Sequence, residues 1–175
     1  MPQAVTHIII PLVMADIYRD YIAKKKFNIC YVLIAGLAGL LPDIDILFAW
    51  LLKSFSDITI SLIHRTITHS LLFPFLFLIL FLLAKNYNPN FLKRQKLKLN
   101  YVFIAIAFGT LVHIILDFTF SGSVYILYPL SNFKIGLNII PLGYFEGTFF
   151  AGLDAIILVL WLVHEELKHR ISDYI

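Results

Sequence analysis

The feature that most restricts what this chain can fold into is a series of long apolar segments. No charged residue occurs from Phe27 to Pro42, and hydrophobic residues make up 60% of the 175-residue sequence. Only 14% of the residues are charged, whereas a soluble domain usually carries about 25% charged residues. The composition therefore predicts an integral membrane protein rather than a soluble domain.

Five segments have the length and hydrophobicity of helices, so the predicted fold is all-α. Together they form an integral membrane bundle of four to five helices, which makes up a single domain over residues 1–175. The predicted helices cover residues 4–21, 27–52, 70–84, 99–120 and 148–165. Several are shorter than the ~20 apolar residues that a full membrane span needs, so we expect some to tilt or to lie partly in the membrane interface.

Basic residues are concentrated in three connections of this bundle. They follow the first predicted helix, join the third to the fourth, and follow the fifth. The members are Lys24, Lys25, Lys26, Lys85, Lys93, Arg94, Lys96, Lys98, Lys168 and Arg170. Because positive residues favour the cytoplasmic side, we expect a multi-pass protein of the inner (cytoplasmic) membrane, with residues 53–69 and 121–147 on the outer side.

The charge and the cysteine content exclude two other classes. The formal net charge is only +3 and the basic residues are dispersed, so membrane lipids are expected partners and nucleic acid is not. Cys30 is the only cysteine, which excludes a disulfide framework and a cysteine-based zinc ribbon.

Histidines and carboxylates gather at one level of the predicted topology, near the outer face. A carboxylate at membrane depth costs about 2.5–3.5 kcal/mol on insertion scales, so Asp43, Asp45 and Asp117 need partners. Arg65 is the only arginine nearby, and a divalent ion neutralises several carboxylates at once. The charge balance therefore favours a bound metal.

Two of the short motifs also have plain structural interpretations. His113 and Asp117 are spaced i, i+4 and share one helical face, which suits a shared metal or a hydrogen bond within the helix. Asp43 and Asp45 follow Pro42 and suit either a ligand pair or a turn with an N-cap.

The remaining histidines are similarly ambiguous when each is taken alone. His64 and His69 lie five residues apart across a turn into the third helix, and interfacial residues with Thr68 or Ser70 as the helix cap give the same pattern. His7 alone is more often a packed histidine. Because separate segments bring all of these residues to one level, we favour a metal site near one membrane face.

Imidazole and carboxylate ligands together are typical of zinc, manganese or iron sites. We expect one to three divalent ions, with zinc first and manganese or iron as alternatives. The predicted ligands are His7, Asp43, Asp45, His64, His69, His113 and Asp117, and the further candidates are Glu146 and Asp154. Such ions activate a water molecule and bind the oxygens of a phosphoryl group, so the predicted function is metal-dependent hydrolysis.

The order and spacing of these residues resemble a known family. The matching motifs are Thr6-His7, Leu41-Pro42-Asp43-Ile44-Asp45, His64-Arg65-x-x-Thr68-His69-Ser70, Gly109-x-x-x-His113-x-x-x-Asp117, Gly122 and Pro129. They resemble the YdjM-like proteins, described as LexA-binding, inner-membrane-associated metal-dependent hydrolases. The resemblance covers about residues 6–130 and implies an all-α membrane bundle with hydrolase activity. LexA as a partner is implied by the family description alone.

Two positions depart from the family pattern. Ile46 stands where a histidine is common, and Thr66 stands where a glycine is common.

A more distant likeness is to zinc-dependent phospholipase C and the S1/P1-type nucleases. Those soluble enzymes combine, in the same order, an early histidine, a PD-x-D-like motif, a histidine and an H-x-x-x-D helix. The likeness implies cleavage of a phosphodiester or phosphomonoester. The ligands that it carries over are His7, Asp43 or Asp45, His64, His113 and Asp117. Their later histidine and glutamate ligands have no clear counterpart here, since neither Glu146 nor Asp154 matches in spacing.

The predicted mechanism uses Asp45 as the general base and Arg65 to bind a phosphate oxygen. The outer connection 121–147, which contains Tyr125, Tyr128, Pro129, Pro141 and Tyr144, is expected to form a lid that admits a lipid-like or other phosphorylated substrate. Anchoring by aromatics at the membrane surface is the alternative. Two other functions stay open. An ion or proton transporter also uses intramembrane histidine and aspartate, and a regulatory or scaffold protein uses a metal only to join helices.

Overall fold

The structure, a computed structural model, describes residues 4–25, 27–53, 64–120, 123–137, 139 and 146–170. These residues form seven α-helices and, apart from one isolated antiparallel bridge between Val124 and Ile135, they contain no β-structure. The helices are α1 (Ala4–Ile17), α2 (Ile29–Ala38), α3 (Ile44–Lys53), α5 (Leu72–Leu83), α6 (Asn90–Arg94), α7 (Leu99–Phe120) and α8 (Glu146–His169). A π-helical turn, η1 (Tyr18–Ile22), continues α1, and a 3-10 turn, η2 (Ala84–Asn86), continues α5. The all-α prediction is confirmed.

Two helices are long and apolar enough to cross a membrane. They are α7, with 22 residues, and the 23 residues Gly147–His169 of α8. The helix α2 and the stretch Leu72–Asn86 are apolar but shorter. These lengths agree with the predicted membrane protein, although the described residues form more helices than the four to five expected.

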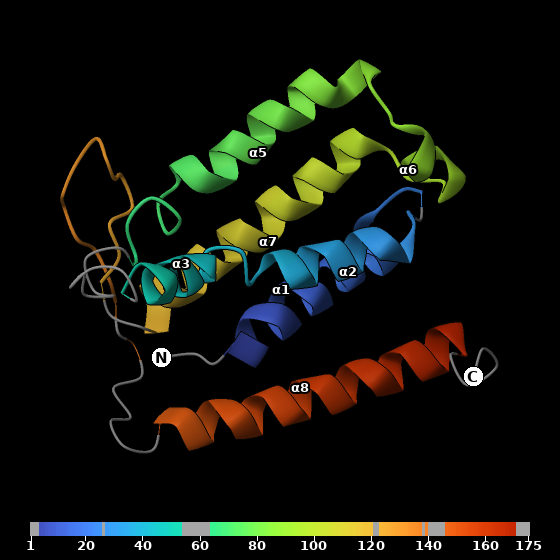
Figure 1. The fold of residues 1–175 in the computed structure, drawn as a ribbon. Helices are drawn as coiled ribbons and strands as arrows, with labels where there is room; N and C mark the ends of the chain where they lie inside the picture. Colours follow the sequence, from blue (N-terminus) through green and yellow to red (C-terminus); the bar gives the residue numbers. More distant parts are fainter. Residues whose placement is uncertain are drawn as a thin grey trace.

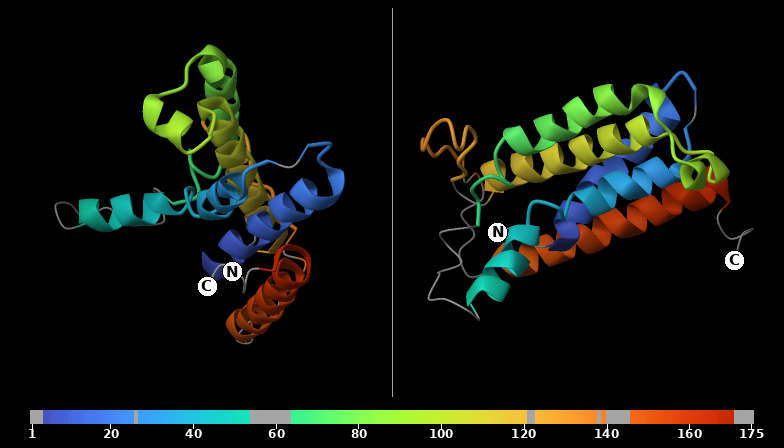
Figure 2. Two further views of the ribbon diagram at one scale, coloured as in Figure 1. Left: turned by 90° about the vertical axis from the view of Figure 1, so that its right-hand side faces the viewer. Right: turned by 45° about the horizontal axis from the view of Figure 1, so that its top comes forward.

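The second predicted helix, over residues 27–52, is two helices in the structure. Asn28 caps α2, because its side chain accepts a hydrogen bond from a backbone N–H in the first turn. After α2 the chain makes a series of tight turns through Pro42, which has no N–H to continue a helix, and α3 starts two residues later. The helix α3 then leaves the bundle sideways (Figure 2, left). The extra helix therefore comes from this break.

The other boundaries lie closer to prediction. The helix α7 covers the predicted residues 99–120, and α5 lies within the predicted residues 70–84. In contrast, α8 begins two residues before and ends four residues after the predicted residues 148–165. The five-residue α6 was not predicted, because so short a helix shows no hydrophobic period.

The helix α7 is central to the bundle, and α8 lies at its edge. Figure 1 shows α7 beside α5 on one side and beside α1 and α2 on the other, whereas α8 packs against α1. Within the most apolar 18 residues of each helix, 44% of the residues of α7 are buried but only 11% of those of α8. Most of the apolar surface of α8 is thus left exposed, as expected for a helix that faces lipid.

Two glycines permit the close approach of the helix backbones. A Cβ on Gly39 would overlap the backbone carbonyl oxygen of His7, and a Cβ on Gly109 would overlap that of Ala35. Only glycine therefore allows the end of α2 to lie so near α1, and α7 so near α2. This approach brings the start of α1, the end of α2 and the end of α7 together.

Candidate metal centre

The main predicted ligands come together at one end of the bundle, where α1 begins and α7 ends (Figure 1). His7 is on α1, Asp43 is in the turn before α3, His69 is in the connection before α5, and His113 and Asp117 are on α7. All except Asp43 are at most 2% exposed. Imidazole and carboxylate groups so far from solvent need polar or charged partners.

The imidazoles of His69 and His113 face each other through their Nε2 atoms, which are 3.2 Å apart. Oδ1 of Asp43 lies 3.4 Å from Nε2 of His69 and 3.7 Å from Nε2 of His113. Oδ2 of Asp117 lies 3.6 Å and 3.9 Å from the same two nitrogens. In a tetrahedral site with metal–ligand bonds of 2.0–2.2 Å, neighbouring ligand atoms are about 3.3–3.6 Å apart. Each carboxylate oxygen therefore lies near the spacing that one ion shared with the two imidazole nitrogens requires.

Hydrogen bonds behind each imidazole fix which nitrogen carries a proton. Nδ1 of His113 lies 2.6 Å from the carbonyl oxygen of Gly39, which can only accept, so the Nδ1–H of His113 donates. Nδ1 of His69 lies 3.1 Å from the hydroxyl of Thr68, and that hydroxyl donates its own proton to Asp45 at 2.7 Å. The Nδ1–H of His69 therefore donates to Thr68. Each Nε2 keeps a lone pair, in the arrangement by which proteins orient metal-binding histidines.

Two lone pairs facing each other across 3.2 Å repel unless a positive charge lies between them. Burial lowers the pKa of His69, but its contacts with Asp43 and Asp45 and the charge of Asp117 outweigh burial and raise the pKa to about 9. Without a metal, one imidazole thus keeps an additional proton at neutral pH. The space favours positive charge, which a divalent ion also supplies.

His7 forms one wall of this space. Its ring stacks on that of His113 with the centroids 3.9 Å apart, and its Nε2 lies 3.5 Å from Oδ1 of Asp117. His7, His113 and Asp117 form one group of candidate ligand atoms, and Asp43, His69 and His113 form another. Because Nδ1 of His113 is already hydrogen bonded, both groups use the same Nε2. A single nitrogen binds one ion, so the two groups describe one centre.

Asp45 lies behind this centre, on the first turn of α3. Its Oδ1 is 2.9 Å from Nδ1 of His64, and its Oδ2 accepts from the Thr68 hydroxyl and from the backbone N–H of Arg65. Burial opposes ionisation, but the contacts with His64, His69 and Thr68 hold the pKa of the Asp45 carboxyl well below its usual range. These contacts hold Asp45 against His64 and Thr68, and its roles as base and ligand stay predictions.

A third group of candidate ligand atoms consists of Asp45, His64 and His69. An ion at this group, beside one at the first centre, would require His69 to bind through both ring nitrogens, and Nδ1 is already hydrogen bonded to Thr68. The contacts therefore favour a single ion out of the one to three predicted. Nε2 of His64 is buried and makes no hydrogen bond.

Arg65 lies beside the centre, with Nε 3.5 Å from Oδ2 of Asp117. Its backbone has a φ of 65°, in the left-handed region. The predicted phosphate-binding side chain is thus next to the ligand atoms.

Asp154 lies outside these three groups of ligand atoms. It is buried on α8 and accepts a hydrogen bond of 2.9 Å from the hydroxyl of Thr6, which precedes His7. The residue therefore joins α8 to α1. The side chain of Glu146, together with Gly122, Pro141 and Tyr144, lies outside the described residues.

Part of the predicted lid folds back towards the centre. The backbone N–H of Leu71 donates to the carbonyl of Ile126, and that of Leu137 donates to the carbonyl of Phe118. Residues 123–137 are thus attached near the start of α5 and the end of α7. Whether this segment admits substrate stays a prediction.

Comparison with protein families matches residues 1–171 to the family described as YdjM inner membrane protein. This match covers nearly the whole chain and confirms the resemblance drawn from the motifs. The description, together with the two long apolar helices, agrees with the predicted inner membrane. No curated protein and no solved structure matches the chain, so the likeness to phospholipase C and the S1/P1-type nucleases stays an expectation.

Proposed function

The chain belongs to the YdjM inner membrane protein family, and we propose that it is a membrane-bound, metal-dependent hydrolase of a phosphoester. The observation that carries this proposal is the pair of Nε2 atoms of His69 and His113, which lie 3.2 Å apart with carboxylates beside them. Imidazole nitrogens with two carboxylates suit zinc. The charges of Asp43 and Asp117 would balance that of one divalent ion, and His7 borders the same space.

When bound, a divalent ion lowers the pKa of a water molecule and polarises a phosphoryl oxygen. We place His64 as the general base, because Asp45 accepts from its Nδ1–H and its Nε2 has no hydrogen bond. Asp45 then orients His64 and His69. The planar guanidinium of Arg65 suits a phosphate oxygen at the edge of the centre.

We further propose that α7 and α8 cross the membrane with the metal centre towards the outer face. Lys93 and Arg94 on α6 and Lys168 at the end of α8 lie at the opposite end of the bundle from the centre (Figure 1). Positive residues favour the cytoplasm. Residues 123–137, which are attached near the centre, expose apolar side chains. Leu130 is 82% exposed and Phe133 is 65% exposed, and such a surface suits a lipid-like substrate.

The test is to measure metal content and hydrolysis of the protein purified in detergent. We expect about one zinc ion per chain, with hydrolysis of bis(p-nitrophenyl) phosphate or of a phospholipid in mixed micelles. His113→Ala should lose both the bound zinc and the hydrolysis, because it removes the Nε2 atom that two of the groups of candidate ligand atoms share. Asp154→Asn is the matched control, because this buried carboxylate binds Thr6 and lies outside the ligand groups.

Two results would refute the proposal in different ways. Wild-type protein that binds no divalent metal would exclude the centre itself. Bound metal without hydrolysis of a phosphomonoester, a phosphodiester or a phospholipid would exclude the hydrolase. Metal-dependent ion uptake into vesicles would then indicate an ion transporter. If no uptake occurs either, the remaining alternative is a regulatory or scaffold protein in which the metal only joins helices.

A further inference from the structure

A second group of ionisable side chains lies at the other end of α1, about 14–20 Å along the helix from His7 at 1.5 Å per residue. It is formed by the last turn of α1, by η1 and by the last turns of α8. Its members are Asp16, Arg19, Asp20, His164, Glu165, Lys168 and His169. None of these side chains takes part in the candidate metal centre.

Two carboxylate oxygens in this group lack a hydrogen bond. Arg19 donates from Nε to Asp20 at 3.2 Å, and its Nη2 lies 2.7 Å from Nε2 of His169. The same Nη2 is 3.3 Å from Oδ1 of Asp16 and 3.7 Å from Oε1 of Glu165, yet neither oxygen forms a hydrogen bond. Asp16 is only 1% exposed and Glu165 only 5%. Buried acceptors of this kind normally have a partner.

The carboxylates also outnumber the permanently charged cations. Three carboxyl groups, those of Asp16, Asp20 and Glu165, lie against two such cations, those of Arg19 and Lys168. The imidazoles of His164 and His169 contact the same carboxyl groups. One ligand atom from each of Asp16, Asp20, His164 and Glu165 lies within 4.8 Å of the others. The spacing of these ligand atoms thus suits one more cation.

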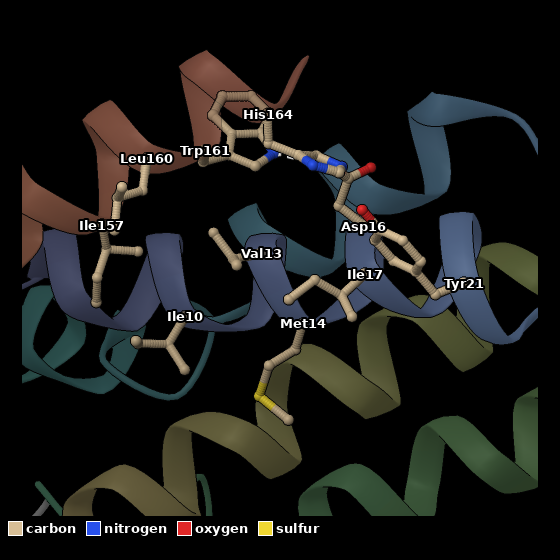
Figure 3. Close-up of a pocket in the computed structure, with 10 residues that line it drawn as sticks. All are labelled: Ile10, Val13, Met14, Asp16, Ile17, Tyr21, Ile157, Leu160, Trp161 and His164. Carbon is tan, nitrogen blue, oxygen red and sulfur yellow. Dashed lines mark hydrogen bonds between the residues drawn. The ribbon is translucent and has the colours of Figure 1, made fainter. Parts of the chain in front are cut away.

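The apolar part of the contact between α1 and α8 is incompletely packed. A cavity of about 490 Å³ lies between the two helices. Figure 3 shows Asp16 and His164 near one end of this cavity, whereas Ile10 and Ile157 lie towards the other. Because close packing and polar contacts associate helices in a membrane, the polar groups at the two ends of this contact carry much of its stability.

We propose that Asp16, Asp20, His164 and Glu165 bind a second divalent cation, which joins α8 to α1. One imidazole and three carboxylates suit manganese or iron, because oxygen ligands favour harder ions than zinc. Arg19 lies beside this ion and keeps its contacts with Asp20 and His169. The site shares no ligand with the candidate metal centre.

Binding of Mn²⁺ to chelator-treated protein in detergent tests this site, because the electron paramagnetic resonance signal of free Mn²⁺ counts the ions that are bound. The measurement uses His113→Ala as the background, so that the first centre does not contribute. We expect this variant to bind about one Mn²⁺ per chain. Adding Glu165→Gln should weaken binding at least about tenfold, whereas Glu166→Gln, one residue away on the same helix, should not.

Fluorescence gives a second readout from the same proteins. The indole N–H of Trp161 donates to Oδ2 of Asp16 at 3.1 Å. The sequence has two tryptophans, so Trp50→Phe leaves Trp161 as the only source of tryptophan fluorescence. Paramagnetic Mn²⁺ should quench Trp161 in the His113→Ala background and fail to do so after Glu165→Gln. If Glu165→Gln loses helical circular dichroism, His164→Asn replaces it.

The proposal is overturned if the His113→Ala background binds no Mn²⁺, or binds it equally with and without Glu165→Gln. Arg19 would then be the cation that completes the group. Either result leaves the proposed hydrolase untouched, because its test depends on zinc at the first centre.

Discussion

Replacing Gly39 by alanine should disrupt the metal centre, although Gly39 has no side chain with which to bind an ion. The added Cβ would overlap the carbonyl oxygen of His7 and lie 2.9 Å from its carbonyl carbon. Both atoms belong to the backbone, so no side chain can rotate away. The clash is relieved only if α1 and the end of α2 move apart.

That movement weakens two features of the centre at once. It displaces His7, and it lengthens the 2.6 Å hydrogen bond from His113 to the carbonyl of Gly39. Losing such an outer hydrogen bond typically lowers metal affinity about 10–100-fold. Overpacking costs about 1–3 kcal/mol, and each kcal/mol shifts the melting temperature of a chain of this size by about 2–4 °C. We therefore expect a melting temperature lowered by about 2–12 °C.

The assay combines thermal unfolding with zinc affinity measured by competition against a chromophoric chelator. Gly152→Ala on α8 is the matched control, because a Cβ at that position meets nothing within 4 Å. Alanine there should stabilise the helix by about 0.5–1 kcal/mol. If Gly39→Ala binds zinc as tightly as Gly152→Ala, the close backbone approach does not position the centre, and the reasoning is refuted.

Three further predictions concern single contacts. Thr68→Val removes the hydroxyl between His69 and Asp45, so zinc affinity in the same competition assay should fall about 10–100-fold. Thr68→Ser keeps the hydroxyl and should preserve the affinity. Equal losses in both variants would contradict the role of Thr68 in orienting His69. Thr6→Val removes the hydrogen bond to Asp154, so the free energy of unfolding in a denaturant titration should fall by about 1–3 kcal/mol. An unchanged free energy would mean that this bond does not help to hold α8 against α1. In metal-free protein, burial opposes ionisation of Asp20, but its contacts with His169, Arg19 and Lys168 hold the pKa of its carboxyl well below its usual range. His164 faces the same oxygen. A lowered pKa stabilises the fold above the unfolded value of about 4 and ceases to do so as the pH falls further, so acid should loosen α8 and change Trp161 fluorescence; an identical acid response in Asp20→Asn would contradict this.

Most of the predicted ligands could be recognised because they are polar residues within apolar segments. His113 and Asp117 share a helical face, and Asp43 and Asp45 follow a proline that stands in the break between two helices. These patterns have few structural explanations inside a membrane bundle. The structure accordingly brings His7, Asp43, His69, His113 and Asp117 to one place, as the motifs predict.

The number of ions could not be predicted in the same way. We expect it to depend on which ring nitrogen of His113 is available, because Nδ1 is hydrogen bonded to the carbonyl of Gly39. A backbone carbonyl has no sequence signature. The contacts of Asp45 with Thr68 and of Asp154 with Thr6 could not be predicted for a similar reason, because only the packed helices create them.

The second group of ionisable residues escaped the sequence analysis for a topological reason. Asp16, Arg19 and Asp20 look like the solvated end of a short helix when they are read along the chain. Their partners on α8, such as Glu165 and His169, lie about 145 to 150 positions later. Only the packing of α8 against α1 shows that these two polar ends meet.

The position of α8 at the edge of the bundle bears on the order of biosynthesis. Every residue in the three groups of candidate ligand atoms at the first centre lies between His7 and Asp117, ahead of α8 in the chain. A nascent polypeptide that has been synthesised as far as the end of α7 therefore already carries all the donor atoms. The later arrival of α8 adds its packing against α1, the contact of Asp154 with Thr6 and the group at the far end of α1. Folding of the part that carries the candidate metal centre and docking of the last helix are thus separable events.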